Sequence, residues 1–548
     1  MRPPPKLSAF VVRGASVLDG SGADPSVADV RVSASGRIDE IAQNITPTEG
    51  DRIVDAQGLA VAPGFIDLHS HSDLYTVQPV DRGAPVGDAP KLIQGCTVQV
   101  FGQDGISAAP IRDEDLDDYR RSIAGLDGNI DRSLWTWRSF GEYLDAVRSG
   151  STTRAAGLVG HSTLRRYVMG MENRPPSGDE MTEMQAVLAE SLDAGAAGIS
   201  TGLVYVPAAF ADTDELVALA EVAASRQKPF FVHVRSESEH LIESTDEVIE
   251  VARRSGVDLH YSHLKAAGKR HWSKADALIS QLMQAAESGV RLSADLHPYT
   301  AGSSTAAVLI PPWALEGGPD AALHRLSDTS VRDRIRDQLL HDVTTWDNWF
   351  DFSGGWEGIR IADSRRDGVM GQSFAQFIHD HDVHDFHSQE AFDLVFDLLI
   401  EEELGIPLIS FNGLEENVVK FLGESYVSIG SDGVVTPNGM PHPRLYGTFA
   451  RVLGRLVREL GVLDLPEAVR RMTSQAAAVV GLADSVGTIA VGRAADVVLF
   501  DPATIIDRAT YDEPRLTPKG VHEVWIGGRT VARNGVVEPH VLPAAHDA

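Results

Sequence analysis

The sequence is poor in features that mark whole classes of protein. Its 548 residues hold one cysteine, Cys96, so an intramolecular disulfide is excluded and a cytoplasmic location is expected. No apolar run approaches the ~20 residues of a membrane-spanning helix, and residues 1–6 precede no signal-peptide core. Lys and Arg number 48 against 78 Asp and Glu. The resulting net charge of −30 argues against nucleic acid or an anionic membrane as a partner.

Both ends of the chain show the pattern of a small all-β unit. Short runs rich in β-branched residues, separated by Gly, Asp and Ser, occur within residues 9–60 and again at residues 496–500 and 522–531. Neither end alone is large enough for a good hydrophobic core. We therefore predict one β-sandwich that is assembled from residues 1–62 and 484–548.

The sequence between these ends repeats a strand, a loop and a helix. Amphipathic helical stretches follow most of eight short apolar runs, at residues 65–69, 97–103, 156–160, 196–200, 230–234, 259–263, 291–295 and 426–431. Eight such units predict an α/β fold, a TIM-type (β/α)8 barrel over residues 63–483. Residues 313–410 interrupt the repeat with an aromatic-rich insertion. It is either a lid over the barrel mouth or a packing elaboration without contact to substrate.

Residues that bind metals recur where the predicted strands end. His69 and His71 end the first strand and lie two residues apart, so their side chains share a face. Later strand ends carry Asp104, His161, His233, His263, His297 with Tyr299, and Asp432. A histidine pair alone is weak evidence, since satisfied histidines in a loop give the same pattern. The repetition indicates a site, because catalytic residues of a TIM barrel lie at the C-terminal strand ends.

These residue types indicate hydrolytic chemistry. Four histidines and two carboxylates at one barrel mouth match a site for one or two divalent metal ions, and imidazole ligands suit Zn²⁺. A bound metal ion lowers the pKa of water to ~7 and polarises a carbonyl, which hydrolysis of an unreactive amide requires. Asp432 follows the last strand, where it either moves a proton to the leaving nitrogen or caps the next helix.

Several motifs resemble the amidohydrolase superfamily. They are Gly64-Phe65-Ile66-Asp67-x-His69-x-His71, His233, Ser262-His263-x-Lys265 and Ser431-Asp432-Gly433. Further stretches resemble one branch, the D-aminoacylases or N-acyl-D-amino-acid deacylases: Gln94-Gly95-x-Thr97, residues 198–205, 261–268 and 442–449, and Gly487-x-Ile489-x-x-Gly492-x-Ala494-Ala495-Asp496. The resemblance runs from about residue 10 to residue 537 and is weakest in the insertion.

The resemblance implies a metal-binding role for each matching position. His69 and His71 would hold one metal ion, and His233 and His263 the other, with Asp432 as the adjacent general acid/base. The branch usually has a cysteine ligand after the second strand, where this chain has Asp104. A carboxylate is harder than a thiolate and can bridge two ions, so the metal preference or the number of ions is expected to differ.

The resemblance also implies a substrate site. Arg444 and Lys265 would grip the α-carboxylate of an N-acyl amino acid. Nearby positions would continue the pocket or orient groups in it: His297, Tyr299, Ser303 and His161. His297 departs from the tyrosine that the family more often has, Tyr299 is an alternative group for polarising the scissile carbonyl, and His161 is equally interpreted as a structural residue.

The activity implied by the resemblance is metal-dependent hydrolysis of an N-acyl amino acid, of D configuration, to a carboxylate and a free amino acid. Its partner would be a small carboxylate-bearing amide, and a homo-oligomer stays open. A D-dipeptide would use the same machinery, and a cyclic amide, as in hydantoinases and dihydropyrimidinases, is the alternative substrate. A catalytically inactive binding protein is disfavoured, because all four histidines and Asp432 are present.

Overall fold

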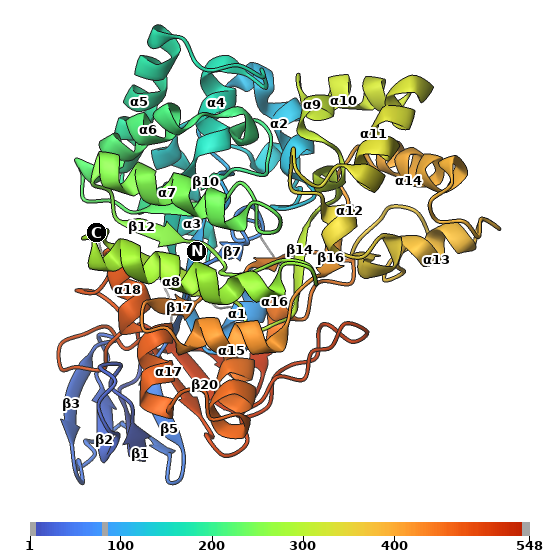
Figure 1. Cartoon of the computed structure of the whole chain (residues 1–548). Coiled ribbons are helices and arrows are strands. Elements are labelled where there is room, and N and C mark those ends of the chain that lie inside the picture. The colour runs from blue at the N-terminus through green and yellow to red at the C-terminus, as the bar shows by residue number, and fades with distance from the viewer. Residues whose placement is uncertain (1–6, 79–85, 540–548) are drawn as a thin grey trace.

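Eight parallel strands form a nearly closed barrel at the centre of the molecule (Figure 1). The computed structural model describes residues 7–78 and 86–539. In sheet order the strands are β17 (Val427–Ile429), β13 (Leu292–Leu296), β12 (Leu259–Tyr261), β11 (Phe230–His233), β10 (Gly198–Gly202), β9 (Arg154–Gly160), β8 (Cys96–Phe101) and β6 (Phe65–Asp67). Each coincides with a predicted strand, which confirms the TIM-type barrel.

A short strand pair joins the two ends of this order. β7 (Ser70–His71) runs parallel to β18 (Gly433–Val434), with Gly433 opposite Ser70 and Val434 opposite His71. The segment after β6 and the segment after β17 therefore lie side by side at the barrel mouth. Both segments carry residues that the sequence predicts for the site.

Helices cover the outside of the barrel, and their ends follow local sequence signals. They include α1 (Ala89–Leu92), α2 (Leu116–Ile123), α3 (Phe140–Gly150), α4 (His161–Met169), α5 (Gly178–Asp193), α6 (Thr213–Ala224), α7 (Leu241–Ser255), α8 (Ala275–Glu287), α15 (Glu415–Gly423), α16 (Arg444–Arg451), α17 (Leu465–Met472) and α18 (Ser474–Val479). Ser177 and Glu180 form a capping box that starts α5. Gly256, with a φ of 71°, ends α7 in the left-handed conformation that glycine adopts without strain. Among the described residues, no helix has the length and hydropathy needed to cross a bilayer.

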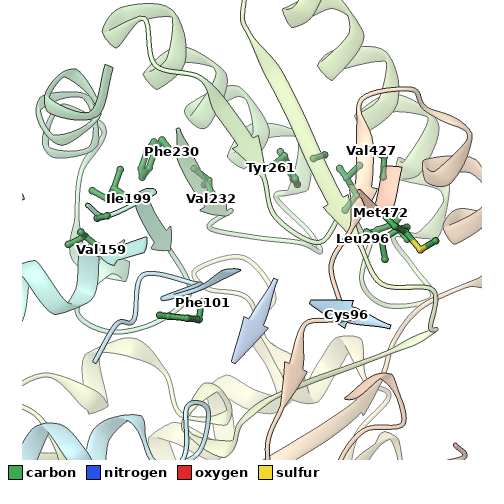
Figure 2. Close-up of a cluster of buried hydrophobic side chains, with 14 of the residues drawn as sticks. Cys96, Phe101, Val159, Ile199, Phe230, Val232, Tyr261, Leu296, Val427 and Met472 are labelled. Carbon is green, nitrogen blue, oxygen red and sulfur yellow. The ribbon is translucent and has the colours of Figure 1, made fainter. Parts of the chain in front are cut away.

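The barrel core is built from side chains that strands and helices share. Figure 2 shows part of this cluster, in which Phe101, Ile199, Phe230 and Leu296 are buried. Cys96 belongs to the same cluster, and burial raises the pKa of its thiol well above the usual value. Cys96 is therefore an inert core residue and not a metal ligand.

Strands from both ends of the chain join in one nine-stranded sheet. Its order is β22 (Val536–Val537), β21 (Arg529–Arg533), β20 (Val521–Ile526), β19 (Val497–Phe500), β5 (Ala60–Pro63), β1 (Phe10–Val17), β2 (Ser26–Val32) and β3 (Ile38–Ala42), with β4 (Arg52–Asp55) paired to β1. Across the sheet Phe10 stacks on Trp525, with 5.2 Å between ring centroids. The predicted assembly of the two ends is thus observed, whereas the domain boundaries at residues 62–63 and 483–484 stay a prediction.

The insertion between β13 and β17 has a core of its own. Its strands β14 (Ala301–Thr305), β16 (Pro407–Phe411) and β15 (Ile359–Ile361) form a three-stranded sheet. Its helices are α9 (Pro312–Leu315), α10 (Pro319–Leu326), α11 (Thr329–His341), α12 (Trp349–Phe352), α13 (Phe374–His379) and α14 (Gln389–Glu401). Phe350 and Phe392 both pack against Trp356, at 4.7 and 5.1 Å between centroids. These aromatic side chains of the insertion are therefore core, and a lid role for residues 313–410 stays a prediction.

Candidate metal centre

Six ionisable side chains from the strand ends converge at the barrel mouth. Each is at most 4% exposed, and together they form two overlapping groups of potential metal ligands: His69, His71, Asp104 and Asp432, and Asp104, His233 and His263. The first two follow β6, and the others follow β8, β11, β12 and β17 or end them. All six residues predicted as ligands are thus brought together by the fold.

Asp104 lies between the two histidine pairs. Its Oδ1 is 3.6 Å from Nε2 of His69 and 3.4 Å from Nε2 of His263. Its Oδ2 is 3.6 Å from Nε2 of His71 and 3.7 Å from Nδ1 of His233. Each carboxylate oxygen therefore faces one histidine of each pair, and Asp104 belongs to both groups of potential ligands.

The unpaired atoms of this cluster fit a divalent metal ion. Nε2 of His69, Nε2 of His71 and Oδ1 of Asp104 are buried without a hydrogen-bond partner, although buried polar atoms normally have one. Nε2 of His71 lies 3.3 Å from Oδ1 of Asp432. Ligand atoms about 2.1 Å from a tetrahedral zinc ion are about 3.4 Å apart, so the spacing suits a shared cation.

A second set of carboxylates lies within 3.4 Å of the outer nitrogens of three histidine rings. The pairs are Nδ1 of His71 with Oδ1 of Asp127 at 3.0 Å, Nδ1 of His263 with Oε1 of Glu237 at 3.0 Å, and Nδ1 of His69 with Oδ2 of Asp295 at 3.4 Å. Such partners fix the ring orientation and the tautomer of a metal-binding histidine. The sequence interpretation missed all three carboxylates. Asp295 ends a predicted strand and the strand-end rule could have found it, whereas Asp127 and Glu237 lie in loops without a recognisable pattern.

Three of the six ligand positions have an unusual backbone. Asp104, His263 and Asp432 have φ values of 54°, 35° and 52°, in the left-handed region that non-glycine residues rarely adopt. Such conformations persist where the surrounding structure enforces them, and they cluster at functional sites. The fold thus turns these three side chains inward at a cost in backbone energy.

The cluster keeps its carboxylates ionised. Burial raises the pKa of Asp432, but the charges of Arg444 and His69 outweigh this effect and hold the pKa well below its usual value. Burial likewise opposes ionisation of Asp104, and the neighbouring His233 and His263 outweigh it. Asp104 and Asp432 are therefore two buried carboxylates within one cluster, and their negative charge favours the binding of a cation there.

Three residues predicted for substrate binding surround Asp432 and the outer carboxylates. Arg444 is fully buried, its Nη1 is 2.8 Å from Oδ2 of Asp432, and its Nη2 donates to the carbonyl oxygen of Ser303. Nε2 of His297 is 3.8 Å from Oδ2 of Asp432. Nζ of Lys265 is 3.2 Å from Oε1 of Glu237. Nε of Arg444 has no hydrogen-bond partner, so this guanidinium keeps a donor for a further anion.

Two other predicted positions point to different partners. The Tyr299 hydroxyl donates to Oδ2 of Asp507 at 3.3 Å, so it faces the C-terminal segment. Nδ1 of His161 is 2.9 Å from Oγ1 of Thr201, and its Nε2 is 2.7 Å from Oε1 of Glu215. Both nitrogens of His161 are engaged, so this side chain joins α4 to β10 and α6 and lies outside the ligand cluster.

A cavity of about 160 Å³ lies between the barrel loops and the insertion. Its walls are mostly apolar and include Ile106, Leu203, Tyr205, Val308, Leu315 and Trp346. Tyr205 connects it to the cluster, because its ring packs against that of His233 with 5.4 Å between centroids. No periodic pattern in the sequence predicts this cavity, since its walls come from distant segments.

Comparison with known proteins decides the family. A model of the amidohydrolase family matches residues 52–366 and 424–532. The chain belongs to this amidohydrolase family. The amidohydrolase is 32% identical over 530 residues to D-aminoacylase from Alcaligenes xylosoxydans xylosoxydans, across 95% of this chain and 94% of that protein. It is 35% identical to N-acyl-D-glutamate deacylase from the same organism, over 95% and 93% of the two chains.

A solved structure agrees with this placement. N-acyl-D-glutamate deacylase from Bordetella bronchiseptica, complexed with zinc and a phosphonate inhibitor, matches with a TM-score of 0.78 and 31% identity. The match covers 98% of the amidohydrolase and 100% of that chain. The predicted D-aminoacylase branch is therefore confirmed.

Proposed function

We propose that this amidohydrolase is a metal-dependent N-acyl-D-amino-acid deacylase. The observation that carries the proposal is the buried cluster of unpaired histidine nitrogens and carboxylate oxygens, with the Arg444 guanidinium directly beside it. Its relatives over nearly the full chain are D-aminoacylase and N-acyl-D-glutamate deacylase, which supports the same activity here.

Asp432 is the proton carrier of the proposed reaction. A divalent cation held by His69, His71, Asp104, His233 and His263 would lower the pKa of water to ~7 and polarise the amide carbonyl. Asp432 takes a proton from the attacking water and delivers it to the leaving nitrogen as the C–N bond breaks. The products are a carboxylate and a free amine. The pKa of Asp432 lies well below its usual value, so the carboxylate is ionised near neutral pH and carries no proton before water attacks.

Arg444 and Lys265 provide the positive charge for the substrate carboxylate. Arg444 has an unpaired Nε, and the planar guanidinium suits a carboxylate. Its contact with Asp432 would also place the α-carboxylate next to the nitrogen that Asp432 protonates. An open-chain acid fits two such cations better than a cyclic amide does, which favours the deacylase over the hydantoinase-like alternative.

The cavity beside Tyr205 fits an apolar amino-acid side chain. An apolar cavity of about 150 Å³ accommodates a benzene ring, and this one has a volume of about 160 Å³. Arg235 lines it, but its guanidinium already bonds to Glu247 and to the carbonyl oxygens of Ala209 and Ala211. Four of the five N–H donors of Arg235 are thereby engaged within the protein, and most of the walls are apolar, so D-leucine or D-methionine derivatives are the proposed substrates.

A hydrolysis screen tests the proposal. N-acetyl derivatives of D- and L-leucine, methionine, glutamate and aspartate are compared with a D-dipeptide and a 5-substituted hydantoin, with and without added Zn²⁺. Zinc-dependent release of D-leucine and D-methionine is expected. Preferred release of D-glutamate would contradict the apolar assignment, and turnover of the hydantoin alone would replace the deacylase by the cyclic-amide alternative.

A further inference from the structure

A buried lysine contacts two residues that lie near ligand positions in the sequence. Lys91, on the short helix α1, has no exposed surface. Its Nζ donates to Oδ2 of Asp67 and to Oγ of Ser431, both at 2.6 Å. Lys91 touches none of the six ligand residues through these bonds, so any influence on the reaction passes through Asp67 and Ser431.

Asp67 and Ser431 are also bonded to each other. The backbone N–H of Ser431 donates to Oδ1 of Asp67 at 2.7 Å, and the Ser431 hydroxyl donates to Oδ2 at 2.6 Å. Asp67 ends β6 and Ser431 follows β17, so the network connects the two end strands of the barrel order. The ammonium, the carboxylate and the hydroxyl form one closed triangle.

This triangle fixes two reactive side chains relative to each other. His69 follows Asp67 by two residues, and its backbone N–H faces Oδ1 of Asp67 at 3.3 Å. Asp432 follows Ser431 directly, and its backbone N–H donates to the carbonyl oxygen of His69 at 2.7 Å. A Cβ on Gly433 would lie 3.0 Å from Nζ of Lys91 and 3.0 Å from Oγ of Ser431, so a larger residue would crowd their contact.

The helix that carries Lys91 is anchored to the same metal-binding segment by a second route. Asp88 precedes α1 and is buried, and it accepts from Nε2 of Gln99 at 2.9 Å and from Oγ of Ser151 at 3.0 Å. Oε1 of Gln99 in turn accepts from Oγ of Ser70 at 3.0 Å. The segment 67–71 is thereby bonded to α1 and the residue before it at two points, through Asp67 to Lys91 and through Ser70 and Gln99 to Asp88.

We propose that Lys91 is a positioning residue of the catalytic centre, which sets the placement of Asp432 against His69 through Asp67 and Ser431. A buried ion pair is weak evidence for stability, since apolar side chains of similar volume stabilise a fold as well or better. What an apolar side chain cannot supply is the set of directed bonds between the two strand ends. Misplacement of reacting groups by about 1 Å costs roughly 100-fold in rate, so such bonds matter for turnover.

Four variants separate positioning from charge balance. Ser431→Ala removes the hydroxyl and leaves the ion pair. Lys91→Met removes the ammonium and leaves the Asp67 carboxylate unpaired. Lys91→Met combined with Asp67→Asn removes both charges, so it can be measured even if the single variant fails to fold. Lys420→Met is the control, because Lys420 forms an exposed ion pair with Asp276 on the surface.

Two measurements are made on each zinc-loaded variant: steady-state kcat and KM with N-acetyl-D-leucine, and the rate of zinc transfer to a colorimetric chelator. For Ser431→Ala we expect kcat to fall about tenfold or more at nearly unchanged KM, and zinc release to accelerate by a similar factor, as for other partners behind metal ligands. The double variant is expected to regain melting temperature without regaining kcat. Lys420→Met is expected to match the wild type.

Two results would overturn the assignment. The first is wild-type kcat and zinc release in Ser431→Ala, and the second is full recovery of both quantities in the double variant. The kinetic arm rests on the proposed deacylase activity, whereas zinc release does not. If the wild type cleaves no N-acyl-D-amino acid, the proposed function fails and zinc release alone decides the role of Lys91.

Discussion

Replacing Asp432 by asparagine separates its chemistry from its packing. The amide keeps the size of the side chain and one acceptor oxygen, but it cannot carry a proton between water and nitrogen. General acid/base catalysis contributes roughly 10²–10⁴-fold, which corresponds to about 2.7–5.4 kcal/mol of activation free energy. We therefore expect Asp432→Asn to lose at least ~100-fold in kcat.

The structure adds a cost in stability to this change. Arg444 is fully buried and its Nη1 lies 2.8 Å from Oδ2 of Asp432. Asparagine leaves that guanidinium without its counter-ion, and breaking a buried pair costs about 3 kcal/mol of unfolding free energy. The melting temperature should fall accordingly. The five other ligand residues remain, so zinc should still bind.

The assay measures kcat, zinc content and melting temperature of the same preparation. Asp496→Asn is the matched control, because Asp496 pairs with Arg154 at 2.5 Å beside the nine-stranded sheet, outside the metal centre. The control should lose stability and keep kcat. A kcat of Asp432→Asn within tenfold of the wild type, at normal zinc content, would remove Asp432 from the proton transfer.

Three further changes test other parts of the site. Arg444→Ala should raise KM, and because it removes the charge that lowers the pKa of Asp432, the acidic limb of the kcat/KM profile should move to higher pH; an unmoved profile contradicts this pairing. Asp104→Ala should lower the zinc content measured by elemental analysis, and unchanged zinc would exclude Asp104 as a ligand. Burial raises the pKa of Glu215, but His161 and Arg165 outweigh burial, so the pKa is lowered in the folded protein. The ionised Glu215 therefore stabilises the fold above its unfolded pKa of about 4.3, and this stabilisation is lost as the pH falls. Glu215→Gln should therefore flatten the loss of melting temperature on acidification, and an unchanged slope would contradict the assignment.

The ligand cluster was predictable because it follows a repeating rule. Parallel strands place their C-terminal ends at one barrel mouth, so His69, His233 and Asp432 could be grouped without knowing their distances. The same rule does not tell ligands from other residues, because His161 also follows a strand and lies outside the ligand cluster. Its ring turns toward Thr201 and Glu215, and the sequence does not encode which way the side chain leaves the strand end.

Residues that act through long-range contacts were not predictable. Lys91 stands between Pro90 and Leu92 in a short segment, nothing in the local sequence assigns it a partner, and only closure of the barrel buries it against Asp67. The family resemblance predicts a pocket role for Tyr299, and it gives no indication that its hydroxyl donates to Asp507 in the C-terminal segment. Such contacts depend on which distant segments meet, and local propensity and periodicity carry no information about that.

Because the nine-stranded sheet contains strands from both chain ends, it can be completed only near the end of synthesis. β5 pairs with β1 on one side and with β19 on the other, where Ala62 faces Val498. The ribosome produces β5 early and β19 only after the whole barrel, so one edge of β5 stays unpaired through most of translation. An exposed strand edge is a template for aggregation. The strand that leads directly into the His69 segment is thus completed last, and chains released before β19 should accumulate as insoluble material.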